Sequence, residues 1–144
     1  MIKSNNLKKI INRTKTASAK LLNLSAKQRS AVLLNLSKSL LANQKAIIKA
    51  NLRDIAATVK NNQPDSFIER LSLDGHKIKA MADSLKLIAA QPDTLFKIIK
   101  QYRRPSGLKI KKVVYPLGLV AMIYESRPNV TIDAFALSFK SGNA

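Results

Sequence analysis

The chain has 144 residues, of which 46% are hydrophobic, and this size allows one domain with a buried core. It contains no cysteine, which excludes disulfide bonds and any thiol nucleophile within the sequence, and no apolar run reaches the ~18–20 residues that cross a bilayer. The formal net charge is +18, and the first 53 residues contain twelve Lys or Arg and no acidic residue. Such a balance raises non-specific affinity for nucleic acid and for anionic surfaces.

Two features of the composition favour a solvated, Lys-rich surface over a specific nucleic-acid site. Lysine accounts for 19 of the 26 basic residues, whereas base and phosphate recognition favours the fork of arginine. Aromatic residues are 5% of the chain, too few for a base-stacking platform.

The basic amino terminus also lacks the continuous apolar segment of a secretory signal. We therefore expect a cytoplasmic protein with no membrane partner and no specific nucleic-acid partner.

The first half of the chain has the apolar spacing of helices. Residues 5–23 predict an amphipathic helix, and Ser25 is placed to cap the next one. Apolar residues then recur every three or four positions as far as Val59, with a break expected near Asn51.

A turn and two shorter helices complete this helical region, which spans residues 1–91. Residues 61–65 combine Asn, Gln, Pro and Asp, which is typical of a turn, and residues 66–71 predict a short helix. Asp74 is placed to cap the next helix, which Pro92 and Asp93 end. The buried stripe predicted for that helix consists of Ile78, Met81, Leu85 and Ile88.

Residues 92–115 predict a pair of antiparallel strands. Two segments rich in apolar and basic residues flank the sequence Arg104-Pro105-Ser106-Gly107, in which Pro and Gly occupy favourable turn positions. Either an exposed hairpin or an oligomer interface is consistent with this pattern.

Residues 116–144 predict a buried strand, a polar corner and a helix. Residues 113–123 form a nearly continuous apolar run, which suits a strand covered on both faces. Residues 125–129 then place two charges, a hydroxyl and an amide together, and Gly142 is positioned to end the helix that follows. Because ligands bind at the carboxyl ends of strands in open α/β sheets, the corner is a candidate ligand site.

The same segment carries a resemblance to a known family. Residues 116–144, PLGLVAMIYESRPNVTIDAFALSFKSGNA, resemble the PLG-x-x-x-x-IYE-[SA]-RPNVT-x-D segment, closing in K-[ST]-GNA, of γ-glutamyl phosphate reductases. This family, also called glutamate-5-semialdehyde dehydrogenase, belongs to the aldehyde dehydrogenase superfamily. The similarity extends upstream through LSLDGHKIKAMADSL and, more loosely, over nearly the whole chain. It covers about the first third of the family's length.

The resemblance implies an α/β fold built in three parts. These are amino-terminal helices over 1–91, an antiparallel strand pair over 92–115 that serves in oligomerisation, and the first strand and helix of a truncated Rossmann-like NADP-binding domain of the aldehyde dehydrogenase fold over 116–144. The catalytic domain with its cysteine is absent. We therefore expect an amino-terminal fragment of a homo-oligomeric enzyme, inactive alone and either poorly stable or self-associating.

The activity implied for the complete enzyme is the NADPH-dependent reduction of γ-glutamyl phosphate to glutamate-5-semialdehyde in proline biosynthesis. A cysteine thiolate attacks the acyl phosphate and expels phosphate, and NADPH reduces the thioester. The alternative is a basic helical protein that binds nucleic acid or anionic surfaces, for which a steep loss of affinity with salt would be diagnostic.

The resemblance also suggests roles for the corner residues. Asn129 is the candidate donor to the oxyanion, or else it caps a helix beginning near Val130. Arg127 is the candidate partner for the carboxylate or phosphoryl group of the substrate, or else it pairs with Glu125 or Asp133. Tyr124, Glu125 and Ser126 are expected to bind the cofactor, with a structural role as the alternative for Glu125.

Overall fold

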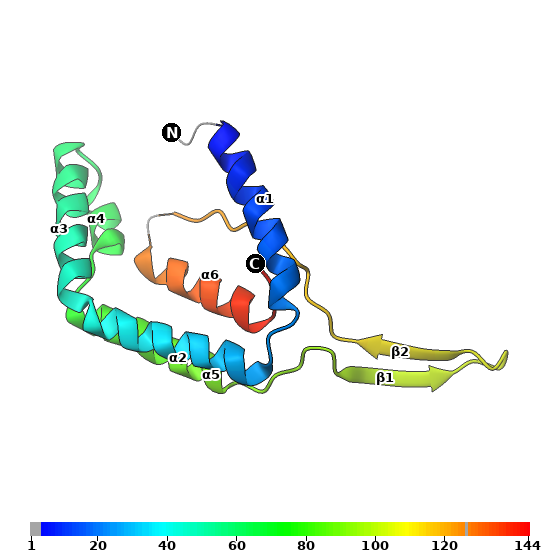
Figure 1. Cartoon of the computed structure of the whole chain (residues 1–144). Helices are drawn as coiled ribbons and strands as arrows, with labels where there is room; N and C mark the ends of the chain where they lie inside the picture. The colour runs from blue at the N-terminus through cyan, green and yellow to red at the C-terminus, as the bar shows by residue number, and fades with distance from the viewer. Residues whose placement is uncertain (1–3, 126) are drawn as a thin grey trace.

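The computed structural model describes residues 4–125 and 127–144, and Figure 1 shows their arrangement. Helices α2 and α5 lie side by side, α6 packs against α5, and a two-stranded hairpin projects away from the helices. None of the described helices is long and apolar enough to cross a membrane. The elements in chain order are α1 (Ser4–Leu21), α2 (Ala26–Ala42), α3 (Gln44–Lys60), α4 (Asp65–Leu71), α5 (Gly75–Ala90), β1 (Ile98–Arg103), β2 (Lys109–Val113) and α6 (Pro128–Lys140).

Helix α2 begins at a capping box, as the sequence predicted for Ser25. The Ser25 hydroxyl accepts a hydrogen bond from the Gln28 N–H at 3.3 Å, and the Gln28 side chain accepts one from the Ser25 N–H at 2.8 Å. Two backbone donors that the helix leaves without partners are thereby satisfied.

The predicted break near Asn51 is wrong, because the chain turns at Asn43 instead. The Asn43 side chain donates to the Ser39 carbonyl at 2.8 Å, and this local bond competes with continuation of the helix. Asn51 lies inside α3 and is buried. Its amide donates to the Leu71 carbonyl at 2.9 Å and accepts from the Leu73 N–H at 2.8 Å, so it joins α3 to the segment between α4 and α5.

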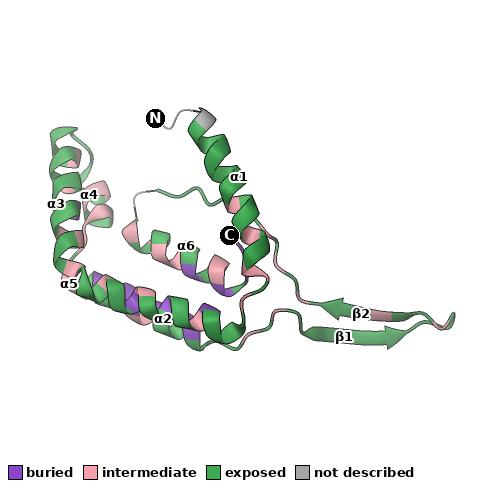
Figure 2. Cartoon of the chain, viewed as in Figure 1, coloured by how far each residue is buried: buried purple, intermediate pink, exposed green. Residues whose placement is uncertain are grey.

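The buried stripe predicted for α5 is confirmed. The Asp74 carboxylate caps this helix by accepting from the Lys77 N–H at 2.7 Å, and that bond lowers the pKa of Asp74. Figure 2 shows buried residues on the facing sides of α2, α5 and α6. The predicted stripe residues, all buried, are Ile78, Met81, Leu85 and Ile88, and the central cluster consists of Leu33, Leu85, Ile88, Ala89 and Ala136.

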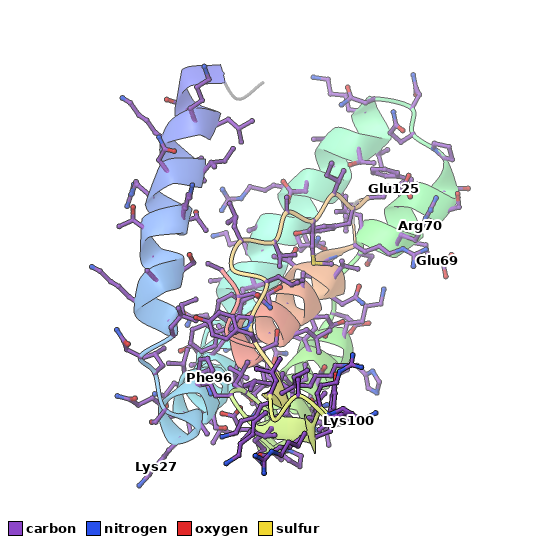
Figure 3. The ribbon with its side chains drawn as sticks, turned by 90° about the vertical axis from the view of Figure 1, so that its right-hand side faces the viewer. Lys27, Glu69, Arg70, Phe96, Lys100 and Glu125 are labelled. Carbon is purple, nitrogen blue, oxygen red and sulfur yellow. The ribbon has the colours of Figure 1, made fainter. Side chains whose placement is uncertain are left out.

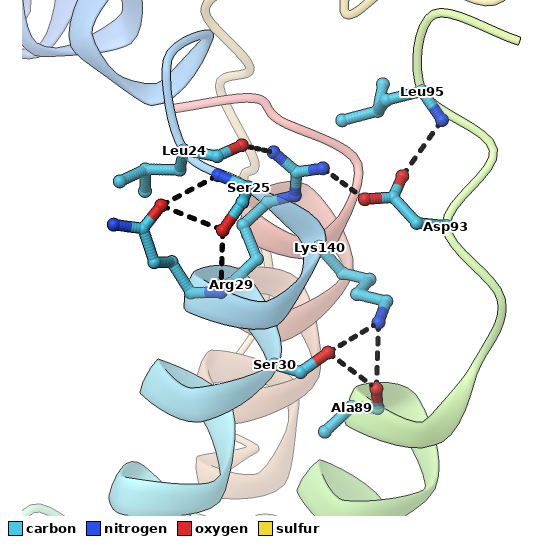
Figure 4. A network of polar contacts seen from close by, with 9 residues as sticks. Leu24, Ser25, Arg29, Ser30, Ala89, Asp93, Leu95 and Lys140 are labelled. Atoms are coloured by element: carbon cyan, nitrogen blue, oxygen red, sulfur yellow. Dashed lines mark hydrogen bonds and ion pairs between the residues drawn. The ribbon is translucent and has the colours of Figure 1, made fainter.

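A buried ion pair joins the start of α2 to the segment that follows α5. The Arg29 guanidinium, 3% exposed, pairs with the Asp93 carboxylate and also donates to the Leu24 carbonyl (Figure 4). Burial acts to raise the pKa of Asp93, but hydrogen bonds from the Leu95 N–H and from Arg29 outweigh it, and the pKa falls below its ordinary value.

Lys140 ties the end of α6 to the same region. Its buried ammonium donates to the Ala89 carbonyl at 2.8 Å and to the Ser30 hydroxyl at 3.0 Å. Because Ser30 also donates to the Ala89 carbonyl, at 2.9 Å, one polar cluster connects the ends of α5 and α6 with the start of α2 (Figure 4).

The predicted antiparallel strand pair is confirmed. Strands β1 and β2 pair with Tyr102 opposite Ile110 and Lys100 opposite Lys112. Gly107 closes the turn, with a φ of 84° and its N–H donating to the Arg104 carbonyl at 2.9 Å. Both strands are largely exposed and have no further strand beside them in the part of the chain described (Figure 2).

The strand predicted over residues 113–123 is wrong beyond Val113. The segment is extended but exposed, and Leu117 is 86% accessible. A strand requires a neighbouring strand for its backbone groups, and within the described chain the backbone of residues 115–123 bonds to no backbone groups other than those of Ala144. The Ala144 N–H donates to the Gly118 carbonyl and the Val120 N–H donates to the Ala144 carbonyl, both at 2.8 Å, which is the bonding pattern of a parallel bridge.

Helix α6 ends at Lys140, and Gly142, predicted to end it, takes the left-handed conformation just after the cap residue Ser141. The Gly142 N–H donates to the Phe139 carbonyl at 3.0 Å and the Asn143 N–H to the Ser138 carbonyl at 2.8 Å, the two bonds of a Schellman motif. Gly142 has a φ of 77°, and a Cβ at this position would lie 2.9 Å from Cδ1 of Leu95 and 3.0 Å from Cγ of Pro116.

We expect Gly142→Ala to destabilise the fold by about 2 kcal/mol, because it adds a contact clash to an unfavourable φ. Gly118→Ala is the matched control, since Gly118 has a φ of 101° but no atom within 4 Å of the added Cβ. Urea unfolding of both variants measures the difference. Equal losses would mean that the packing of Leu95 and Pro116 contributes nothing.

We expect Asp93→Asn to lower the free energy of unfolding at pH 7 by about 3 kcal/mol, because it leaves Arg29 buried without its counter-ion. Because the folded pKa of Asp93 is depressed, the stabilisation is present above the unfolded pKa of about 3.9 and is lost as the pH falls through the folded value. The difference between variant and wild type should therefore shrink in acid.

Urea unfolding at pH 7 and in acid measures this difference. Asp83→Asn is the control: the Asp83 side chain is 41% exposed, and the side chains of Lys79 and Lys86 lower its pKa to about 2. Little change is expected for Asp83→Asn at pH 7. A loss in Asp93→Asn that is independent of pH would contradict the assignment.

Candidate functional site

A groove of about 550 Å³ lies between α4, α5 and the start of α6. It holds Arg127 and Asn129, the two residues that the sequence predicted for substrate and oxyanion contacts. Its walls come from different parts of the chain, and the packing of α6 against α5 and of α4 against α3 brings them together. The lining residues are Glu69, Arg70, Ser72, Leu73, Lys77, Ala80, Met81, Ser84, Arg127, Pro128, Asn129 and Asp133.

Arg127 does not form either of the ion pairs predicted as its alternative role. Glu125 pairs instead with Arg70, at 3.0 Å, and Asp133 accepts a hydrogen bond from the Ser84 hydroxyl at 3.1 Å. Arg127 is exposed and takes part in no ion pair among residues 4–125 and 127–144. Arg127 lines the groove, and within the described chain no ion pair occupies the hydrogen-bond donors of its planar fork.

The predicted capping role of Asn129 is wrong. Helix α6 begins at Pro128, whose ring fixes φ in the helical range, and Arg127 occupies the cap position without a side-chain capping bond. Asn129 therefore lies inside the first helical turn. Its amide makes no hydrogen bond within the described parts of the chain, and it lines the groove as an available donor.

Tyr124 and Glu125, two of the residues predicted to bind the cofactor, lie before α6 and outside the lining of the groove. The Tyr124 hydroxyl hydrogen-bonds to the Thr131 hydroxyl at 2.8 Å, and Glu125 holds Arg70. These contacts connect Tyr124 to α6 and Glu125 to α4. Ser126, the third residue of this prediction, lies outside the described residues.

Three charged residues of the groove were not singled out from the sequence: Glu69, Arg70 and Lys77. Arg70 pairs with Glu125, and Figure 3 labels both residues together with Glu69, the neighbour of Arg70 on α4. The Lys77 ammonium donates to the carbonyls of Glu69, at 3.3 Å, and Ser72, at 2.8 Å, and so provides hydrogen-bond partners for carbonyls at the end of α4. In the sequence these residues are scattered among apolar and small residues over 69–77, and this pattern gives no indication that they lie near α6.

The groove combines cations and carboxylates in a way that suits a zwitterionic ligand. Arg70, Lys77 and Arg127 contribute positive charge, and the start of α6 adds the positive end of a helix dipole. Glu69 and Asp133 contribute negative charge. Arginine forks bind carboxylate and phosphoryl groups, and carboxylates bind ammonium groups.

Comparison with known proteins adds sequence relatives to this geometry. No protein-family model matches the chain. It is 42% identical over 132 residues to a protein of Caldanaerobacter subterraneus subsp. tengcongensis and 43% identical over 132 residues to one of Carboxydothermus hydrogenoformans, each named gamma-glutamyl phosphate reductase. Both of these curated relatives are gamma-glutamyl phosphate reductases. The alignments cover 92% of this chain and 32% of each relative, so the chain spans about a third of the length of these reductases.

Solved structures of gamma-glutamyl phosphate reductases agree with the sequence comparison. The crystal structure of the Thermotoga maritima reductase matches with a TM-score of 0.86 at 28% identity, over 92% of this chain and 32% of that one. The Saccharomyces cerevisiae reductase matches with a TM-score of 0.88 at 32% identity, over 100% of this chain and 36% of that one. The resemblance read from residues 116–144 is thereby confirmed, and the helical architecture with its antiparallel strand pair is shared with these reductases.

Proposed function

We propose that this chain supplies the amino-terminal part of an NADPH-dependent gamma-glutamyl phosphate reductase, which forms glutamate-5-semialdehyde and releases phosphate in the cytoplasmic synthesis of proline. The observation that carries the proposal is the 42% identity to a reductase of that name over 92% of this chain. The chain contains no cysteine, so the thiol nucleophile must come from another part of the complete enzyme. The 144-residue polypeptide alone therefore does not catalyse the reaction.

In this proposal the residues of the groove act on the acyl phosphate. The Arg127 fork binds an anionic group of the substrate, and the Asn129 amide donates to the carbonyl oxygen on which negative charge develops during thiolate attack. Support comes from the availability of both side chains at the groove, without the ion pair or the capping bond that would occupy them.

The backbone near Ala144 supports the proposed Rossmann-like arrangement. The two hydrogen bonds between Gly118–Val120 and Ala144 follow the parallel pattern with α6 between the bonded segments, as the proposed strand–helix–strand crossover would require. Dinucleotides bind outside the carboxyl ends of such strands, where the corner before α6 lies. When bound, NADPH supplies the hydride; we assign Tyr124, Glu125 and Ser126 to the side of the corner that would hold it.

The hairpin supports the proposed assembly into an oligomer of identical subunits. Its strands expose their outer edges and several apolar side chains, including Ile99 and Leu108. Unpaired strand edges with apolar side chains favour association with another chain.

A chimeric reductase tests the proposed function. The matching third of the Carboxydothermus hydrogenoformans enzyme is replaced by this chain, and NADPH oxidation that depends on γ-glutamyl phosphate is measured. We expect turnover by the chimera and none by the 144-residue chain. A chimera that folds, as judged by circular dichroism, but has no activity would contradict the proposal.

Within the active chimera we expect Asn129→Ala to lower kcat by about 10²–10³-fold, the usual effect of removing one oxyanion donor. Arg127→Gln should lower kcat/KM by about 10–100-fold through loss of a charge-assisted hydrogen bond. Arg53→Gln on the exposed surface of α3 is the control and should behave as the unmodified chimera. Steady-state kinetics would contradict these roles if the three variants were equally active.

A further inference from the structure

Arg70 lines the same groove as Arg127 but comes from the last turn of α4. Its Nε donates to the Ser66 carbonyl at 2.9 Å, which fixes the guanidinium against its own helix. Its Nη1 donates to the Glu125 carboxylate at 3.0 Å. The bond to Ser66 therefore orients the guanidinium, and the bond to Glu125 pairs it with a carboxylate.

The pairing of Arg70 with Glu125 is easily exchanged. The Arg70 side chain is 39% exposed and that of Glu125 is 63% exposed, and ion pairs in contact with water contribute little to stability. A ligand carboxylate or phosphoryl group can replace Glu125 at little cost. The Ser66 bond does not depend on Glu125 and keeps the guanidinium in place during the exchange.

Lys77, the third cation of the groove, is hydrogen-bonded to backbone carbonyls. The Lys77 ammonium holds the two carbonyls at the end of α4, so the arginines Arg70 and Arg127 are the fork-shaped donors of the groove. Two forks from different elements of the same groove suit a ligand with two anionic groups, and Glu69 and Asp133 lie in the same lining for an ammonium group.

We propose that Arg70 is a specificity-determining residue that leaves Glu125 to bind one anionic group of a doubly anionic amino acid, while Arg127 binds the other. This inference rests on the proposed function, since an amino acid acyl phosphate of this class carries a carboxylate and a phosphoryl group. Glu125 acts as the resting partner of Arg70 and as a competitor of the ligand. A ligand that lacks one anionic group leaves Arg70 with Glu125 and binds more weakly.

The test is a titration of the 144-residue chain, labelled with ¹⁵N, with L-glutamate and, as the singly anionic comparison, L-glutamine. Chemical-shift changes at the start of α6 and at the side chain of Arg70 report binding. Arg70→Gln should weaken L-glutamate binding by about 10-fold or more, the usual effect of losing a charged hydrogen bond, and Arg53→Gln should not. Glu125→Gln should tighten binding, because it removes the competitor.

The opposite signs of the two variants separate ligand binding from support of the corner. If Arg70 only braces the corner, Arg70→Gln and Glu125→Gln break the same ion pair and weaken binding alike, which would overturn the proposal. Absence of L-glutamate binding to the folded wild-type chain would also overturn it.

A second measurement uses the chimeric reductase, in which folding is monitored by turnover. Arg70→Gln should raise KM for γ-glutamyl phosphate about 10-fold or more and leave kcat within about twofold. An active chimera whose KM is unchanged by Arg70→Gln would overturn the role of Arg70 and leave the proposed function standing. An inactive chimera, combined with glutamate binding that still depends on Arg70, would overturn the proposed function and leave the role of Arg70 standing.

Discussion

Packing on two sides of helix α5 is the constraint on which the rest of the structure depends. Its apolar stripe meets α2 on one side and α6 on the other, and the central buried cluster draws residues from all three helices. Burial of this kind is the main favourable contribution to folding. Because α5 also carries Lys77, Met81 and Ser84 into the groove, the same contacts that form the core position one wall of the site.

Polar contacts then fix the ends of α6, which apolar packing alone would leave free to slide. At its carboxyl end, Lys140 reaches the Ala89 carbonyl, and Gly142 turns the chain against Leu95 and Pro116. At its amino end, the hydrogen bond between the Tyr124 and Thr131 hydroxyls holds the preceding segment. Non-directional burial and directional hydrogen bonds thus have separate roles: the first brings α6 to α5, and the second sets its position along α5.

The site combines a helix start, which is set locally, with charges delivered by tertiary packing. Pro128 starts α6 by its fixed φ, and this places Asn129 in the first turn instead of at the cap. Arg70 and Glu69 arrive from α4, whose position depends on the Asn51 contacts with Leu71 and Leu73. A buried amide on α3 therefore supports the wall of a groove to which it does not contribute a side chain.

The sequence by itself determined the features that depend on neighbours along the chain. Ser25 and Asp74 cap helices, Gly107 and Gly142 take the left-handed backbone, and the spacing of Ile78, Met81, Leu85 and Ile88 defines a buried stripe, since each depends on residues within a few positions. Only the tertiary structure decided the rest. In the structure the helix break lies at Asn43, and residues 117–125 have no strand partner within the described chain. Glu125 pairs with Arg70, and Arg127 lines the groove. These outcomes depend on which distant groups become neighbours, and a charge or an apolar run does not specify its partner until the helices that carry them have packed.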